Sequence, residues 1–317
     1  MALVTNALTA YTAVGIREDL TDVIYDISPM ETPFMSNVAR NRATNKIHEW
    51  QTDSLAAAAA NAQLEGDTIS AGAVTVTVRP KNHSQIMYKA FAVTGTTEAS
   101  DAAGRASEVS YQVAKHGKEL KRDMEKALTG ELGSVLGSDT VARTLAGVES
   151  WLSTNKYDNG IGTTPGFVTS SGLVTAPTDG TTRAITETLL KGAIQAAWTQ
   201  GGDPNVIMVG PTTKQDISAF SGIATLYNLT NDAQGTIIGG ADLYVSDFGK
   251  HTVVPNRFSQ DRTALVLDMS MWAVSFLRPI FQFDLAKTGD ADQKVVLTEF
   301  TLESRNELAS AKIADIT

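Results

Sequence analysis

Residues 101–130 read DAAGRASEVSYQVAKHGKELKRDMEKALTG and contain the clearest helix of the chain. Apolar residues recur in this stretch at spacings of four and seven, which places them on one face of a helix: Val109, Val113, Leu120, Met124 and Leu128. The other face carries two pairs of opposite charge four residues apart: Lys115–Glu119 and Lys121–Glu125. We therefore expect a helix over 101–128 with one buried face and surface ion pairs on the other.

The segment before this helix has the pattern of a long projecting hairpin. Two extended pieces, KIHEWQTDSL at 46–55 and SQIMYKAFAV at 84–93, flank a stretch of small residues with alanines at 56–60. Valines and threonines alternate over 73–78, which predicts a half-buried strand. The part at 52–72 is too small and polar to carry a core, so we expect it to find contacts elsewhere. A flexible surface loop is the alternative.

The N-terminal section, residues 1–45, is expected to be an arm. Its recognisable part is IREDLTDVIYDISPMETPFMS at 16–36, where Pro29 and Pro33 interrupt regular structure. Apolar residues on such an irregular segment need a partner surface. That surface belongs either to another subunit or to the chain's own domain, onto which the arm would then fold back.

The section after the long helix predicts a mixed architecture. A loop-rich region is followed by a helix over 182–199, a short strand over 205–209 and a helix that starts at Pro211. Five strands are expected in the last third: 243–246, 251–255, 264–268, 272–276 and 294–304. The last of these alternates with one face buried and one exposed. Helices and strands are segregated rather than arranged as βαβ units, which predicts the α+β class.

Composition narrows the function. The chain has 317 residues, 42% of them hydrophobic, no cysteine and a net charge of −9, so a large core is expected without disulfides or thiolate chemistry. No signal peptide or long apolar run is visible, which predicts a protein made in the cytoplasm without membrane contact. Lysine and arginine do not concentrate into a stripe, so we expect no tight nucleic-acid binding.

The search for catalytic motifs predicts no enzyme. The four histidines are scattered, no G-x-S-x-G or G-x-x-x-x-G-K-[ST] motif occurs, and the tryptophans are expected to lie in separate elements. Acidic pairs have no apolar pocket visible in the sequence that would raise a pKa. We therefore expect no catalytic, cofactor-binding or metal site.

Four segments, in this order, resemble the major capsid (head) proteins of tailed bacteriophages. They are IREDLTDVIYDISPMETPFMS at 16–36, KIHEWQTDSLA at 46–56, VSDFGKHTVVPNRF at 245–258 and TLESRNELASAKI at 301–313. The resemblance implies the Hong Kong 97-type capsid fold. It divides the chain into five parts: an N-terminal arm at 1–45, an extended loop at 46–95, a peripheral domain with the spine helix at 96–139, an axial domain at 140–255, and the C-terminal strands of the peripheral domain at 256–317.

The resemblance also implies a function in the virion. Subunits would assemble as pentamers and hexamers into an icosahedral head around double-stranded DNA, in the host cytoplasm. The implied partners are other copies of the chain, a portal protein, a separate scaffolding protein, a decoration protein and packaged DNA, the last touched weakly at the inner face. An encapsulin-like nanocompartment shell and a surface-layer or adhesive protein are the alternatives.

Assembly contacts are expected on the arm, the loop and the long helix. The predicted contact residues are Ile24, Tyr25, Phe34, Met35, Trp50, Leu55, Lys115, Glu119, Arg122 and Glu125. Some relatives link subunits covalently through a lysine on the extended loop. No lysine lies between Ile47 and Pro80, so we expect a non-covalent shell.

Overall fold

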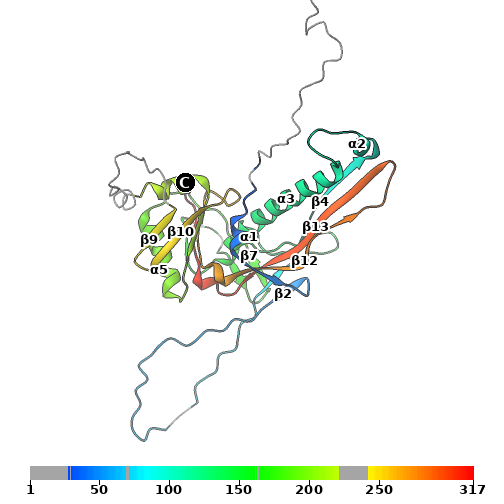
Figure 1. The fold of residues 1–317 in the computed structure, drawn as a ribbon. Coiled ribbons are helices and arrows are strands. Elements are labelled where there is room, and N and C mark those ends of the chain that lie inside the picture. The colour runs from blue at the N-terminus through cyan, green and yellow to red at the C-terminus, as the bar shows by residue number, and fades with distance from the viewer. Residues whose placement is uncertain (1–27, 29, 69–70, 161, 163, 221–241) are drawn as a thin grey trace, which may run out of the picture.

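The computed structural model describes residues 28, 30–68, 71–160, 162, 164–220 and 242–317. It consists of an elongated lobe, a more compact lobe and a loop that projects from the body (Figure 1). Within the described ranges, no helix combines the length and apolar character needed to cross a bilayer.

The elongated lobe is a four-stranded sheet covered on one face by a long helix (Figure 1). The strands lie in the order β1 (Ala39–Arg42), β12 (Trp272–Asp284), β13 (Ala291–Ser304) and β4 (Gln85–Thr94). β1 runs parallel to β12, and the other pairs are antiparallel. Part of the expected arm, 39–42, is therefore a strand of the subunit's own sheet.

The helix α3 (Glu108–Thr129) starts later than the sequence predicts. The side chain of Ser107 caps it by accepting a hydrogen bond from the Ser110 N–H at 3.2 Å, because an N-cap hydroxyl satisfies a free helical donor. A short helix, α2 (Gly95–Ala99), and turns precede that cap. The apolar stripe is confirmed in its second half, where Leu120, Met124 and Leu128 are fully buried.

The compact lobe contains a six-stranded sheet. Its order is β5 (Lys156–Tyr157), β14 (Ala311–Ile313), β11 (Ala264–Leu267), β8 (Val206–Val209), β10 (Gly249–Pro255) and β9 (Leu243–Ser246). The helices α5 (Glu187–Thr199) and α6 (Pro211–Ser218) belong to this lobe. α5 begins at Glu187, five residues later than 182, and the hydroxyl of its N-cap Thr186 accepts a hydrogen bond from the Leu189 N–H.

The C-terminal section contributes strands to both sheets. β12 and β13 complete the four-stranded sheet, but β11 and β14 lie in the six-stranded one. β11 pairs with β8, and β14 pairs with β11, so backbone hydrogen bonds hold both strands there. The chain crosses between the lobes at a short 3-10 helix, η1 (Met269–Met271).

The expectation that β13 exposes one face is wrong for its C-terminal half. β13 is a central strand between β12 and β4, and its residues 298–304 are all buried. Polar side chains cover the second face: Arg143 and Arg278 form ion pairs with Glu299, while His48 contacts Glu303. Alternating carboxylates therefore face ionic partners here rather than solvent.

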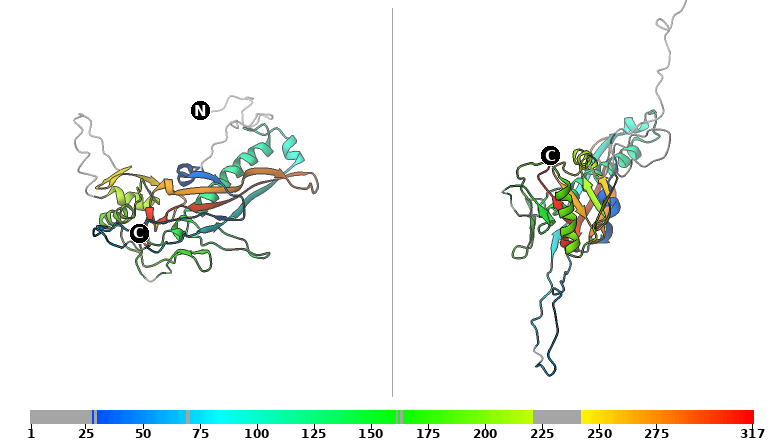
Figure 2. Two further views of the ribbon diagram at one scale, coloured as in Figure 1. Left: turned by 90° about the horizontal axis from the view of Figure 1, so that it is seen from below. Right: turned by 90° about the vertical axis from the view of Figure 1, so that its left-hand side faces the viewer.

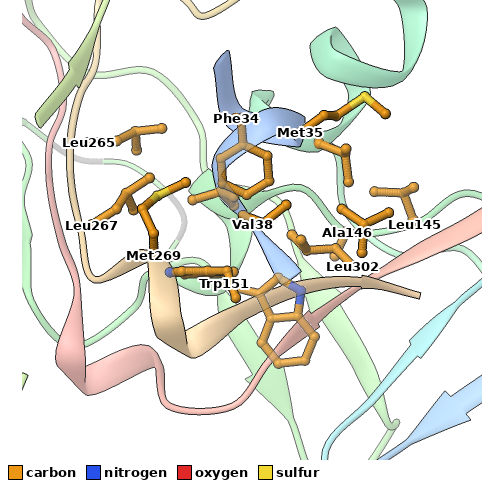
Figure 3. Close-up of a cluster of buried hydrophobic side chains, with 14 of the residues drawn as sticks. Phe34, Met35, Val38, Leu145, Ala146, Trp151, Leu265, Leu267, Met269 and Leu302 are labelled. Carbon is orange, nitrogen blue, oxygen red and sulfur yellow. The ribbon is translucent and has the colours of Figure 1, made fainter. Parts of the chain in front are cut away.

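One hydrophobic cluster joins elements that are distant in sequence (Figure 3). Phe34 of α1 (Pro33–Asn37) lies between Leu267 of β11 and Leu302 of β13, and all three side chains are fully buried. Trp151, from α4 (Val148–Trp151), packs in the same cluster. The sequence placed the tryptophans apart, but the Trp50 and Trp151 ring centroids are 5.4 Å apart.

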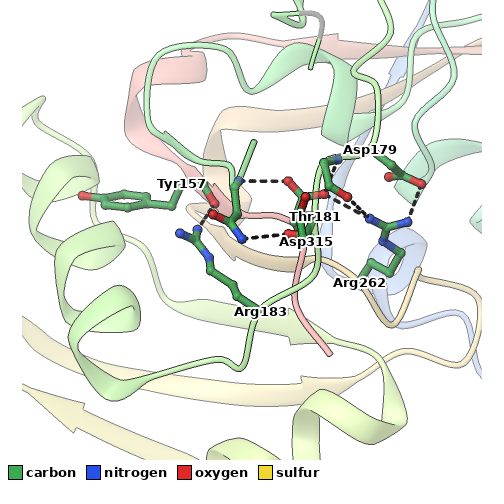
Figure 4. A network of polar contacts seen from close by, with 8 residues as sticks. Tyr157, Asp179, Thr181, Arg183, Arg262 and Asp315 are labelled. Atoms are coloured by element: carbon green, nitrogen blue, oxygen red, sulfur yellow. Dashed lines mark hydrogen bonds and ion pairs between the residues drawn. The ribbon is translucent and has the colours of Figure 1, made fainter. Parts of the chain in front are cut away.

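The C-terminus is fixed by a polar network (Figure 4). Asp315 accepts hydrogen bonds from the N–H of Gly180 at 2.6 Å and from the N–H of Asn159 at 3.0 Å. Arg262 binds both Asp315, at 3.1 Å, and Asp179, at 2.8 Å. The last strand is thereby tied to the loop that precedes α5.

The projecting loop leaves the body from a two-stranded root, β2 (Ile47–Glu49) and β3 (Lys81–His83) (Figures 1 and 2). Beyond it, an isolated bridge joins Thr52 and Val78. The predicted strand at 73–78 is not formed, because among the described residues only the bridge from Val78 to Thr52 pairs with it. A small hairpin of β6 (Gly166–Val168) and β7 (Leu173–Thr175) and a 3-10 turn, η2 (Glu307–Ala309), complete the fold.

Candidate assembly surfaces

The arm is held to the long helix by a buried carboxylate. Glu125 of α3 is fully buried, and its oxygens accept hydrogen bonds from the N–H groups of Phe34 at 2.7 Å and Met35 at 3.0 Å. The side-chain amide of Asn256 donates a third at 2.8 Å. Burial raises the pKa of Glu125, and these three hydrogen bonds oppose that shift. We call Glu125 with these three partners the arm latch.

Three predicted contact residues are thus occupied inside the subunit. Phe34 is 0% exposed, Met35 is 6% exposed and Glu125 is 0% exposed. The surface ion pair expected between Lys121 and Glu125 is not formed, because the carboxylate turns inward to satisfy the free N–H groups at the start of α1. A contact between these side chains and a neighbour would require the core to open. Ile24 and Tyr25 lie outside the described residues.

The projecting loop presents apolar side chains to solvent. Leu55, a predicted contact, is 99% exposed, and further along the loop Leu64, Val74 and Val76 are 82%, 92% and 88% exposed. Trp50, the other predicted contact in this part of the chain, lies at the root instead and is partly buried against the central cluster. Exposed apolar residues gathered on one segment indicate an interaction surface.

The remaining predicted contacts lie along α3. Lys115 is exposed, and Glu119 contacts the ring of His116 at 2.9 Å rather than Lys115. The guanidinium carbon of Arg122 is 5.5 Å from the ring centroid of Phe258, a distance at which a cation is attracted to the ring face. The helix therefore keeps its basic side chains accessible while its acidic ones have partners.

A second apolar surface, missed in the sequence, lies on the face of the elongated sheet opposite α3. Tyr88, Leu297 and Phe281 are register partners on neighbouring strands and therefore share a face. Tyr88 is 64% exposed, and Phe281 stacks on Phe283 with ring centroids 5.8 Å apart. We call this the open sheet face. Its signal was the apolar composition of β4, which has apolar side chains on both faces although Lys89 interrupts the run.

The buried carboxylates of β13, Glu299 and Glu303, have structural partners. Hydrogen bonds from His48, the largest cause, and from Asn41 and Arg305 lower the pKa of Glu303 to about 2. Among the described residues, no three acidic, histidine or cysteine side chains are grouped so as to hold a metal ion. The chemistry visible here is that of packing and ion pairing.

Comparisons with known proteins agree with this geometry. The model of the SU10 major capsid protein family matches residues 3–317. The major capsid protein of Escherichia phage Phieco32 is 26% identical over 338 aligned residues, which cover 95% of this chain and 94% of that protein.

Solved structures share the fold over nearly their whole length. A chain of the cyanophage A-1(L) capsid superimposes with a TM-score of 0.65 at 14% identity, covering 98% of this chain and 100% of that one. A chain of Mycobacterium phage Bobi gives 0.60 at 11% identity, covering 95% and 96%. A chain of the Phage G structure, which holds major capsid and decoration proteins, gives 0.53 at 11% identity, covering 100% of both.

These matches favour a phage capsid subunit over a nanocompartment shell or a surface-layer protein. The two lobes, the long helix over a four-stranded sheet and the projecting loop are the parts expected of the Hong Kong 97-type fold. The chain therefore belongs to the SU10 major capsid protein family and is the major capsid protein of a tailed bacteriophage.

Proposed function

We propose that the chain assembles as pentamers and hexamers into an icosahedral head around double-stranded DNA, in the host cytoplasm. The projecting loop carries this proposal. Its apolar side chains are exposed in the subunit, and burying them against a neighbour is favourable by about 25 cal/mol per Å². Assembly then orders segments that have no core of their own.

We propose the open sheet face of a neighbouring copy as the surface that receives the loop. The alternating Val74 and Val76 side chains suit an extended segment laid on an apolar sheet. Leu55 is the predicted contact residue that this arrangement uses directly. Trp50 would contribute by fixing the root of the loop through its ring contact with Trp151.

The domain assignments follow the sheets. We propose that the four-stranded sheet with α3 is the peripheral domain and the six-stranded sheet the axial domain, which surrounds the centre of each pentamer or hexamer. The boundary between them runs through η1 (Met269–Met271), so the section 256–317 contributes strands to both. The part of the arm before residue 33 is left to contact neighbours.

Further partners are proposed from the same family relationship. A portal protein, a separate scaffolding protein that directs assembly and a decoration protein are the partners we propose. The Phage G structure holds decoration proteins beside its major capsid proteins. Co-purification of particles from infected cells, followed by mass spectrometry, identifies which of these partners are present.

Electron microscopy of the purified protein with its scaffolding protein tests the assembly itself. Closed shells of uniform size are the expected result, with fivefold and sixfold clusters visible after image averaging. Particles that are open sheets or rods, or a subunit that stays monomeric under all assembly conditions, would contradict the proposal.

Charging the apolar side of the loop is expected to abolish shells. In the double variant Val74→Asp, Val76→Asp, two carboxylates would have to be buried at the contact without partners, at a cost of several kcal/mol. The matched control is Thr75→Asp, Thr77→Asp, which adds the same charge to the alternate side chains. Microscopy should show shells for the control and free subunits for the valine variant. Equal assembly by both variants would remove the loop from the interface.

The shell is expected to be non-covalent. The loop between Ile47 and Pro80 has no lysine to serve as the nucleophile of an inter-subunit bond. Mature particles boiled in detergent should run on a denaturing gel as a single band near the subunit mass of 33.7 kDa. A ladder of linked subunits would show that another residue forms the bond.

A further inference from the structure

The outward side of α3 concentrates positive charge. Successive residues of a helix are rotated by about 100°, so spacings of three and four keep side chains on one side. Four basic residues follow such spacings on the side away from the sheet: Lys115, Lys118, Arg122 and Lys126. Leu120 and Met124, which are fully buried, point the opposite way.

The acidic residues of α3 do not neutralise this side. Glu125 is inside the arm latch. Glu119 contacts His116 at 2.9 Å, Asp123 contacts Lys89 of β4 at 2.7 Å, and Glu108 pairs with Arg105. Each carboxylate of the helix therefore has a partner other than Lys115, Arg122 and Lys126.

A fifth cation extends the patch beyond the helix. Arg257 is exposed and lies between Asn256, which is bound to Glu125, and Phe258, whose ring lies under Arg122. In the described part of the chain, Lys115, Lys126 and Arg257 take part in no ion pair. We call these five residues the α3 basic face. It stands out in a chain whose net charge is −9.

We infer that the α3 basic face is the surface through which the subunit contacts the phosphates of duplex DNA, an inference that rests on the proposed function as a DNA-filled head. Lys115 and Lys126 are eleven residues apart, or about 16 Å along the helix. Over that length a duplex presents on the order of 10 phosphates. The cations of the α3 basic face against them give binding that is weak, independent of sequence and salt-dependent.

The residue types favour DNA over a protein partner. Lysine is a flexible point charge that meets phosphate without a fixed geometry, and it is depleted from protein interfaces. The sequence showed no stripe of lysine and arginine, so no tight nucleic-acid binding was expected. Folding changes this locally, because Glu125 turns into the core while Glu119 and Asp123 pair with other side chains. The exposed side of α3 is therefore basic.

The test measures DNA binding by the full-length subunit. A fluorescent duplex of mixed sequence is titrated between about 50 and 200 mM salt, and anisotropy gives the affinity at each salt concentration. The triple variant Lys115→Gln, Lys126→Gln, Arg257→Gln removes three exposed cations without touching the latch. The matched control Lys191→Gln, Lys250→Gln, Lys287→Gln removes the same charge from exposed positions elsewhere.

The triple variant should lose at least about tenfold in affinity at the lowest salt, and its salt dependence should become shallower by about two to three units in the log–log slope. The control should change by less than about threefold. Equal losses in both variants, or no loss in either, would overturn the inference. So would a triple variant that still binds DNA but no longer binds polyglutamate, because the face would then fit an acidic protein segment.

Microscopy of the same preparations separates this inference from the proposed function. If the triple variant forms normal shells, the α3 basic face is not needed for subunit contacts, and its DNA result can be interpreted alone. If the unmodified subunit binds DNA through this face but never forms closed shells, the proposed assembly fails while the binding surface stands.

Discussion

Replacing Glu125 by alanine should lower the free energy of unfolding of the subunit by about 4 kcal/mol or more. The change leaves the buried N–H groups of Phe34 and Met35 and the amide of Asn256 without an acceptor. Each unsatisfied buried donor costs about 1–3 kcal/mol, and the truncated side chain leaves a void. Denaturant unfolding of the free subunit, followed by fluorescence, measures the loss.

Glu119→Ala is the matched control for this prediction. It lies on the same helix, is partly exposed and contacts the ring of His116 at 2.9 Å, so its loss should stay below about 1 kcal/mol. Limited proteolysis adds a structural readout, since loss of the arm latch should make the chain near Pro33 more accessible to cleavage. If Glu125→Ala were as stable as the control, the latch would not be what holds the arm.

Replacing Glu149 by glutamine should remove a large part of the pH dependence of stability. Glu149 is 1% exposed, and neither carboxylate oxygen has a hydrogen-bond partner among the described residues. Burial is the main cause that raises the pKa of Glu149 to about 8, and the nearby Glu131 adds to it. The ammonium of Lys312 acts in the opposite direction, but it hydrogen-bonds the backbone oxygen of Glu149 at 3.1 Å.

The direction in which stability changes with pH follows from proton linkage. Below the unfolded-state pKa of 4.5 the carboxyl is protonated in both states, so it contributes no pH dependence there. Between 4.5 and about 8 the folded state retains a proton that the unfolded chain has lost, and stability falls as pH rises. One pKa unit corresponds to about 1.4 kcal/mol, so the total loss is on the order of 5 kcal/mol once the pH exceeds the folded-state pKa.

Melting curves at several pH values check this prediction. Glutamine has the shape of the protonated acid, so Glu149→Gln should melt close to the unmodified subunit near pH 5 and several degrees above it at pH 8. Glu303→Gln is the control with opposite behaviour. Its carboxylate has a lowered pKa, so its contribution is present above 4.5 and is lost as pH falls toward about 2. Parallel melting profiles for Glu149→Gln and the unmodified subunit would show that Glu149 is ionised in the fold.

Local patterns identified many of the elements. Strand β9 (Leu243–Ser246) and the start of α6 at Pro211 were predicted to the residue, and the buried stripe of α3 was confirmed in its second half. These predictions depend on side-chain periodicity and on the position of proline, both of which determine local structure within a few residues. The start of α3 was predicted too early because the small residues at 101–106 fit a helical pattern, whereas the cap at Ser107 sets the first turn.

The contact residues were harder to predict, because their surroundings depend on residues that are far apart in the sequence. Leu55 could be placed correctly on an exposed loop, because a segment without its own core must project. Phe34, Met35 and Glu125 could not be placed, since their burial depends on groups about ninety residues apart meeting in space. The open sheet face was missed because strand register, which the sequence does not specify, aligns Tyr88 with Phe281 through Leu297.

The sequence by itself determined the α+β class, the order of arm, loop, long helix and β-rich C-terminus, and the segments typical of phage head proteins. Only the tertiary structure decided which sheet each C-terminal strand joins, and that the carboxylates of α3 turn inward or pair while its lysines remain outside. The physical reason is the range of the interactions. Helical and strand periods are set by neighbours along the chain, whereas sheet pairing and the direction of a buried charge depend on distant partners that only folding brings together.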